Sequence, residues 1–147
     1  MADNDRFGTP RVDTLLESTL ASVDSAEELV VAMAQTAGVP EDELHKIGMA
    51  VREAMVNAVV HGNRYNANKR VRLTIGVDAD RMTVRIADQG EGFDMSMLPD
   101  PLADENLLRQ SGRGILLIRA FVDRFHVRSL EGAGTEVTLV KYLSRSA

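Results

Sequence analysis

Between residues 71 and 86 the chain alternates strictly between apolar and other side chains, in two runs separated by a turn at 78–81. Val71, Leu73, Ile75 and Val77 form the first run, and Met82, Val84 and Ile86 form the second. Because successive side chains of a strand point to opposite faces, this period predicts a half-buried antiparallel hairpin. A second hairpin is predicted from residues 125–130 and 135–143, joined across 131–134.

Helical patterns lie around these hairpins. Ser25 and Glu28 have the form of a capping box, which predicts a helix from Ser25 to Ala37, ended by Gly38. Pro40 suits the first turn of a second helix. Its apolar stripe recurs at three- and four-residue steps, and Gly62-Asn63 ends it; the stripe comprises Leu44, Ile47, Val51, Ala54 or Met55, and Ala58.

Three further segments complete the order of elements. Residues 12–20 show an imperfect period of two, which favours a strand, and residues 115–122 form a short apolar helix. Residues 89–111 have no periodicity and are rich in Gly, Pro, Asp and Ser, as in a functional or mobile loop. The order predicts one α+β domain over 11–147, a mainly antiparallel sheet with helices on one face, after a disordered lead-in at 1–10.

Composition narrows the function classes. The 147 residues carry 17 Lys and Arg against 22 Asp and Glu, a net charge of -5, which argues against direct nucleic-acid binding through a basic face. There is no cysteine, hence no disulfide scaffold or thiolate site. With no signal-peptide or membrane-spanning run, a cytoplasmic protein is expected. Residues 1–60 hold 11 acids and 4 bases, which fits either a solvated acidic face or a surface for a basic partner.

The first candidate site is on the second helix. Glu53, Asn57 and His61 recur every four residues, so on an α-helix they lie within about 80° of one another. A carboxylate can accept a proton, and an amide oxygen can coordinate Mg²⁺. The same spacing also fits the exposed side of an ordinary amphipathic helix. His45, His61 and His126 lack a metal-ligand spacing and are expected to be structural.

Two glycine-containing segments form the other candidates. Asp88 directly follows a predicted strand and precedes Gly90 and Gly92. At these two glycines the backbone can turn sharply and approach a ligand closely. Gly112, Arg113 and Gly114 open the short helix, whose free amides and positive end favour phosphate. An ordinary loop and a flexible helix start explain these segments equally well when each is taken alone. Thr135, after Gly134, begins the last strand.

Together, however, the segments occur in a specific order. Glu53/Asn57, Asp88-x-Gly90-x-Gly92, Gly112-Arg-Gly114 and Gly134-Thr135 resemble the N, G1, G2 and G3 boxes of the GHKL ATPase/kinase superfamily. Within it, the chain resembles the stand-alone anti-sigma factor serine/threonine kinases over residues 12–143. The resemblance implies the Bergerat ATP-binding fold, a two-layer α/β sandwich with a mixed, mainly antiparallel sheet and an ATP lid formed by the long loop.

The resemblance also implies roles for individual residues, with ATP and Mg²⁺ as cofactors. Glu53 would be the general base for the incoming serine hydroxyl, and Asn57 would bind ATP and hold Mg²⁺. Asp88 would recognise the adenine amine, with Thr135 nearby through water. The other ATP contacts would be the backbone at Gly90, Gly92, Gly112, Arg113, Gly114 and Ile115, and either Arg109 or Arg113 would meet the γ-phosphate.

The implied biology is partner switching, in which the protein sequesters a sigma factor and phosphorylates a serine of a STAS-domain anti-anti-sigma factor, commonly as a homodimer. The alternative is a nucleotide-gated module that sequesters a transcription regulator without kinase activity. A histidine kinase catalytic domain would need a longer helical segment before Glu53. Retention of Glu53 and Asn57 favours the kinase.

Overall fold

The first strand is followed by two long helices, a hairpin, a short helix and a second hairpin, as the alternation and helical stripes predict. The computed structural model describes residues 9–90, 114–130 and 134–143. The elements are β1 (Thr9–Glu17), α1 (Leu20–Thr36), α2 (Glu41–Val56), η2 (Asn57–Gly62), β2 (Arg70–Val77), β3 (Arg81–Ala87), α4 (Gly114–Phe121), β4 (Arg124–Ser129) and β5 (Thr135–Tyr142).

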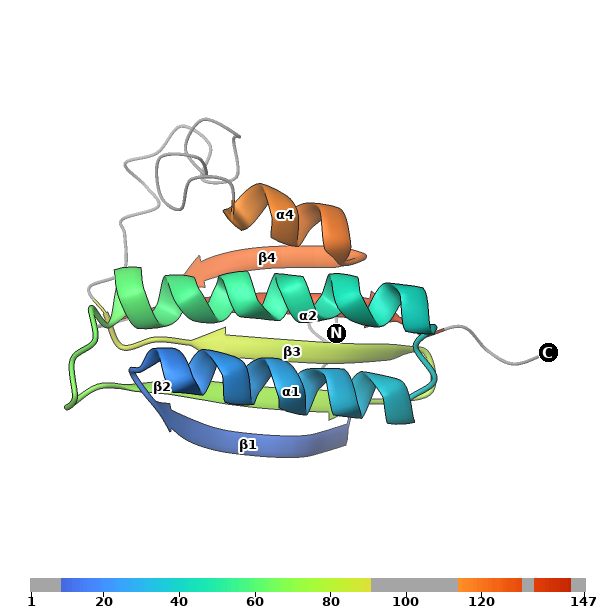
Figure 1. Ribbon diagram of the computed structural model, residues 1–147, viewed down its shortest axis with the longest axis horizontal. Coiled ribbons are helices and arrows are strands. Elements are labelled where there is room, and N and C mark those ends of the chain that lie inside the picture. Colours follow the sequence, from blue (N-terminus) through green and yellow to red (C-terminus); the bar gives the residue numbers. More distant parts are fainter. Residues whose placement is uncertain (1–8, 91–113, 131–133, 144–147) are drawn as a thin grey trace.

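The strands form one five-stranded sheet in the order β1-β2-β3-β5-β4, and every described pairing is antiparallel. The register sets Ile75 opposite Val84 and Val84 opposite Leu139, so these apolar side chains share one face. Figure 1 shows α1, α2 and α4 side by side over a single face of the sheet. The predicted α+β two-layer sandwich is therefore confirmed, with an antiparallel rather than a mixed sheet in the described residues.

The core lies between the helices and that face. The alternating residues Val71, Leu73 and Ile75 of β2 are fully buried, and they meet the buried stripe of α2. Ile47, Val51, Ala54, Met55 and Ala58 of that stripe are buried as predicted. Burial of this kind is the main favourable term in folding. It fixes the direction of α2, whose C-terminal end carries the first candidate site.

The start of α1 differs from the prediction. The helix begins at Leu20, and Thr19 is its N-cap, with Oγ1 accepting a hydrogen bond from the Ser22 amide at 3.3 Å. Ser25 lies inside the helix and donates to the Ala21 carbonyl oxygen. The predicted capping box at Ser25 and Glu28 is therefore wrong, because burial of Ser22 and Val23 extends the helix by more than one turn.

The second helix also departs from a simple α-helix. After Val56 the chain makes a π-helical turn, η2, which the Asn63 amide closes by donating to the Ala58 carbonyl oxygen at 2.8 Å. Such turns add a residue to the helical repeat and are frequent at functional sites. The prediction of one α-helical face through His61 therefore applies to Glu53 and Asn57 only.

Two predicted segments fall partly or wholly outside the described residues. β1 begins at Thr9, so the last two residues of the predicted lead-in belong to the strand. Most of the predicted loop at 89–111, including the ATP lid, lies outside the described ranges, as does the turn at 131–133. Within the described residues, no helix combines the length and the apolar character needed to cross a membrane.

Candidate nucleotide-binding site

Asp88 is the centre of the candidate site. It follows β3 directly and is only 8% exposed. Its Oδ1 accepts hydrogen bonds from the Gly90 amide at 2.9 Å and the Thr135 amide at 3.2 Å. Burial raises the pKa of Asp88, although both amides and the Lys69 charge act in the opposite direction. The structure thus brings together three predicted residues, Asp88, Gly90 and Thr135, although Asp88 and Thr135 are 47 positions apart.

Three glycines make close backbone contacts around Asp88. A Cβ placed on Gly62 would lie 2.4 Å from Asp88 Oδ2, and one on Gly134 would lie 2.1 Å from the Asp88 carbonyl oxygen. A Cβ on Gly90 would lie 2.2 Å from the Gly62 carbonyl oxygen. Gly134 also has a φ of +101°, which side-chain-bearing residues rarely adopt. Because these glycines carry no side chains, the end of η2, the segment after β3 and the residue before β5 approach one another closely around Asp88.

Glu53 and Asn57 lie at the other part of the site, on the last turn of α2 and the first residue of η2. Both side chains are half-buried. The Asn57 amide nitrogen Nδ2 is buried and has no hydrogen-bond partner within the described part of the chain. Such a group needs a partner, because an unsatisfied buried donor is costly. A phosphate oxygen would satisfy the nitrogen, and the opposite amide rotamer would present its oxygen to Mg²⁺. Asn57 therefore fits a bound Mg²⁺–nucleotide.

The glycine-rich helix start is described only in part. Gly114 and Ile115 are the first two residues of α4, as predicted, and Ile118 anchors the helix in the core. Figure 1 shows α4 running beside α2. The predicted residues Gly92, Arg109, Gly112 and Arg113 lie outside the described residues, so their roles stay predictions.

Two residues of the site were missed by sequence reasoning, Gly62 and Asn63. They were interpreted as a helix stop and, with His61, as support for the family resemblance, but neither was given a contact in the site. In the structure Gly62 lies against the Asp88 carboxylate, and Asn63 is 1% exposed and bonded to the backbone amide of Gln89. The signal available was their position directly after the Glu53/Asn57 segment. His61, which precedes them, is exposed.

Comparison with known proteins agrees with this geometry. The histidine kinase-like ATPase domain family matches residues 16–141. The anti-sigma F factor of Clostridium beijerinckii is 32% identical over 102 residues, covering 68% of this chain and 71% of that protein. The anti-sigma F factor of Bacillus thuringiensis is 35% identical over 107 residues, covering 71% of this chain and 73% of that protein.

A solved structure gives the same fold. The mycobacterial sensor histidine kinase MprB superposes with a TM-score of 0.55 over 92% of this chain and 99% of that chain, at 15% identity. At that identity the likeness concerns architecture alone. The family match, the sequence identity and the shared architecture lead to one assignment: the chain belongs to the histidine kinase-like ATPase domain family, in the group of the anti-sigma F factors.

Proposed function

We propose that this protein is an ATP-dependent serine/threonine protein kinase that sequesters a sigma factor and phosphorylates a serine of a STAS-domain anti-anti-sigma factor. The observation that carries the proposal is the buried Asp88 carboxylate, whose Oδ1 is held by two backbone amides and which lies against Gly62, where a side chain would clash with it. A carboxylate held in this way can accept a hydrogen bond from an exocyclic amine. The names of the relatives supply the sigma-factor partner.

The helix supplies the rest of the chemistry. Asn57 would bind the phosphates and hold Mg²⁺, which supplies charge neutralisation at the phosphate oxygens when bound. Glu53 lies one helical turn earlier and would accept the proton of the incoming serine hydroxyl. Phosphoryl transfer demands mainly positioning and electrostatic stabilisation from a protein. Glu53 at the end of α2 and Asn57 at the start of η2 would contribute to both. The amides at the start of α4, including those of Gly114 and Ile115, would bind phosphate oxygens.

The partners follow from the same family membership. We propose a homodimer that acts in the cytoplasm. One surface of the homodimer would bind either the sigma factor or the STAS-domain protein. Phosphorylation of the STAS-domain protein would release that protein from the kinase.

The test combines nucleotide binding with phosphoryl transfer. The purified wild-type protein is titrated with ATP and Mg²⁺ in a calorimeter, then incubated with STAS-domain proteins of the same genome, and phosphoserine is detected by mass spectrometry. We expect Glu53→Gln to retain ATP binding and to lose transfer by about 10²–10⁴-fold. Asn57→Ala should lose Mg²⁺-dependent ATP binding. Glu41→Gln, an exposed change on the same helix, is the matched control.

Each failure has its own meaning. If the wild-type protein takes up no ATP in the presence of Mg²⁺, the whole proposal is wrong. If it binds ATP and a sigma factor but transfers no phosphate to any STAS-domain protein, the kinase step is wrong and a nucleotide-gated binding module remains.

A further inference from the structure

Asn63 is a buried polar residue with no part in the mechanism above. Its Oδ1 accepts a hydrogen bond from the Gln89 amide at 2.7 Å. Its Nδ2 donates to Ser18 Oγ at 2.9 Å and to the Arg70 carbonyl oxygen at 3.1 Å. A carboxamide offers two N–H donors and one carbonyl oxygen, so all three groups have partners. These partners also fix the orientation of the Asn63 carboxamide. If it were flipped, its N–H donors would face the backbone N–H of Gln89, which is also a donor.

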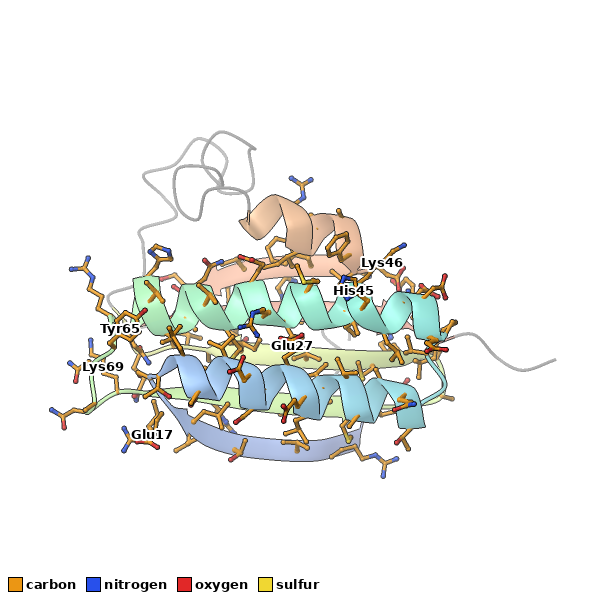
Figure 2. The ribbon with its side chains drawn as sticks, viewed as in Figure 1. Glu17, Glu27, His45, Lys46, Tyr65 and Lys69 are labelled. Atoms are coloured by element: carbon orange, nitrogen blue, oxygen red, sulfur yellow. The ribbon has the colours of Figure 1, made fainter. Side chains whose placement is uncertain are left out.

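The partners of Asn63 are bonded to one another. Ser18 Oγ donates to the Lys69 carbonyl oxygen at 2.7 Å, and Gln89 Oε1 accepts from the Arg70 amide at 2.6 Å. Figure 2 shows Glu17, Tyr65 and Lys69 at the same end of the sandwich. The Asn63 network, comprising Asn63, Ser18, Lys69, Arg70 and Gln89, therefore ties together the end of β1, the end of η2, the start of β2 and the exit of β3.

The backbone of Asn63 also belongs to the helix that carries Asn57. Its amide closes η2 on the Ala58 carbonyl oxygen, as described above. The chain then reverses through Arg64 and Tyr65, at φ values of +53° and +59° that residues other than glycine adopt rarely. The Tyr65 amide donates to the Val59 carbonyl oxygen at 3.0 Å. Asn63 is thus held on the helix side while its side chain reaches the loop after β3.

The bond from Asn63 to the Gln89 amide acts on Asp88. That N–H belongs to the peptide group joining Asp88 to Gln89, so the bond restricts rotation about the Asp88 backbone. The other hydrogen bonds of Asp88 are the one that its own backbone amide donates to the Thr135 carbonyl oxygen at 2.9 Å, and the two that its Oδ1 accepts from the Gly90 and Thr135 amides. Removing the Asn63 side chain would release the peptide group after Asp88 from its hydrogen bond, so the carboxylate would be freer to turn.

We infer that Asn63 is a positioning residue for base recognition, coupling the helix of Asn57 to Asp88 and sharpening the preference for adenine over guanine. The inference rests on the proposed ATP-binding function. Adenine presents an amine where guanine presents a carbonyl oxygen, so a fixed carboxylate favours the first and repels the second. A loosened carboxylate loses much of this discrimination, whereas contacts to the phosphates are shared by both nucleotides.

The test measures the ratio of ATP to GTP affinity in the full chain. Calorimetric titrations with each Mg²⁺–nucleotide are run on Asn63→Ala, Ser18→Ala and Asn66→Ala, after circular dichroism has verified folding. We expect Asn63→Ala to weaken ATP binding about tenfold and leave GTP binding within about twofold. Ser18→Ala removes the Oγ acceptor of Asn63 Nδ2 and leaves the bond to the backbone amide of Gln89 in place. It should lower the free energy of unfolding and keep the ATP/GTP affinity ratio. Asn66→Ala, in the exposed loop that follows Asn63, removes one exposed side-chain bond outside the Asn63 network and should leave the ratio unchanged.

A second variant covers the case in which Asn63→Ala does not fold. Asn63→Asp retains an oxygen for the Gln89 amide and loses the two donors, so the ATP/GTP ratio should be kept even at reduced stability. An unchanged ratio in folded Asn63→Ala, an equal loss for both nucleotides, or a lost ratio in Asn63→Asp would overturn the inference. These results are distinct from a wild-type protein that binds no ATP, which would overturn the proposed function instead.

Discussion

Gly62 lies directly against the carboxylate of Asp88: a Cβ at Gly62 would come within 2.4 Å of both Asp88 Cγ and Asp88 Oδ2. Cβ atoms do not approach non-bonded atoms so closely in proteins. The two residues lie on different elements, the end of η2 and the exit of β3. The absence of a side chain at position 62 is therefore a requirement of the candidate adenine site.

This contact predicts a selective effect of Gly62→Ala. The new methyl group must displace the Asp88 carboxylate or the helix end, so we expect ATP affinity to fall by at least about tenfold and stability by about 1–3 kcal/mol. Calorimetry and urea unfolding measure the two effects. Gly38→Ala is the control, because Gly38 has a φ of +95° but nothing within 4 Å of an added Cβ. It should cost stability and leave ATP binding intact. Equal ATP affinity in Gly62→Ala and the wild type would contradict the prediction.

Asp88→Asn should separate stability from binding. Asn retains an oxygen for the Gly90 and Thr135 amides but removes a buried charge and presents a donor to the adenine amine. We expect ATP affinity to fall roughly a hundredfold while the free energy of unfolding at pH 7 rises. Titration with ATP and urea unfolding of both proteins provide the two numbers.

The pH dependence of Asp88 has a definite sign. The raised pKa means that the folded state binds the Asp88 proton more tightly than the unfolded chain does. The contribution of Asp88 to stability is therefore fully present below the ordinary pKa of about 4 and is lost as pH rises through the raised value. The stability difference between Asp88→Asn and the wild type should grow with pH across this window. A constant difference would show that the pKa is not raised.

The ion pairs of Lys141, at the opposite end of α2, are expected to stabilise the fold. Its Nζ pairs with Glu43 and lies 3.5 Å from Asp123 Oδ2, which accepts a hydrogen bond from the Tyr142 amide at 2.7 Å. Lys141→Met should lower the free energy of unfolding by about 1–2 kcal/mol, because both carboxylates lose their cation. A double-mutant cycle with Glu43→Gln measures the pair itself. Lys46→Met, on an exposed lysine of the same helix labelled in Figure 2, should have little effect.

The stabilisation by Lys141 is expected to disappear at alkaline pH. Burial alone would lower the pKa of Lys141, but the hydrogen bond that its Nζ donates to Glu43 and the Asp123 charge outweigh burial, so the pKa is raised. Its contribution is present below the ordinary lysine pKa of about 10.4 and is lost as pH rises through the raised value. Unfolding curves of the wild type and Lys141→Met should therefore converge above that range. Curves that stay equally far apart would exclude an ionic contribution.

The N-cap of α1 predicts unequal effects of two similar substitutions. Thr19→Ala removes the acceptor of the Ser22 amide and should cost about 1 kcal/mol. Ser25→Ala is an exposed change inside the helix and should stay within about 0.5 kcal/mol. Urea unfolding measures both. A larger loss for Ser25→Ala would return the helix start to the capping box predicted from sequence.

Local patterns predicted the elements well, because alternation and helical stripes depend on neighbours in the chain. The hairpin of β2 and β3 and the buried stripe of α2 follow from those neighbours. Thr19 and Ser25 are both suitable N-caps, and only packing of Ser22 and Val23 in the core decides between them. Local sequence therefore led to the wrong N-cap, Ser25 in place of Thr19.

The site was less accessible to local reasoning. Asp88, Gly90 and Thr135 were singled out through the order of boxes in a resembling family, and the structure brings them together. Asn63 was given no contact in the site, since its bonds to Ser18, Arg70 and Gln89 depend on segments up to 45 positions away. The spacing of residues along the chain does not predict contacts between such distant segments.

The π-helical turn places one more residue between Asn57 and Gly62 than an α-helix of the same span would hold. Because each residue of a π-turn winds through a smaller angle, the added residue is absorbed within the turn and the chain leaves it close to the direction of α2. Deleting one residue would change the bond of the Asn63 amide to the Ala58 carbonyl oxygen from a π-type to an α-type, and would keep Gly62 and Asn63 near their present orientation. The constraint on this segment therefore comes from packing: Ala58 and Val59 are buried in the core, whereas His61 is exposed.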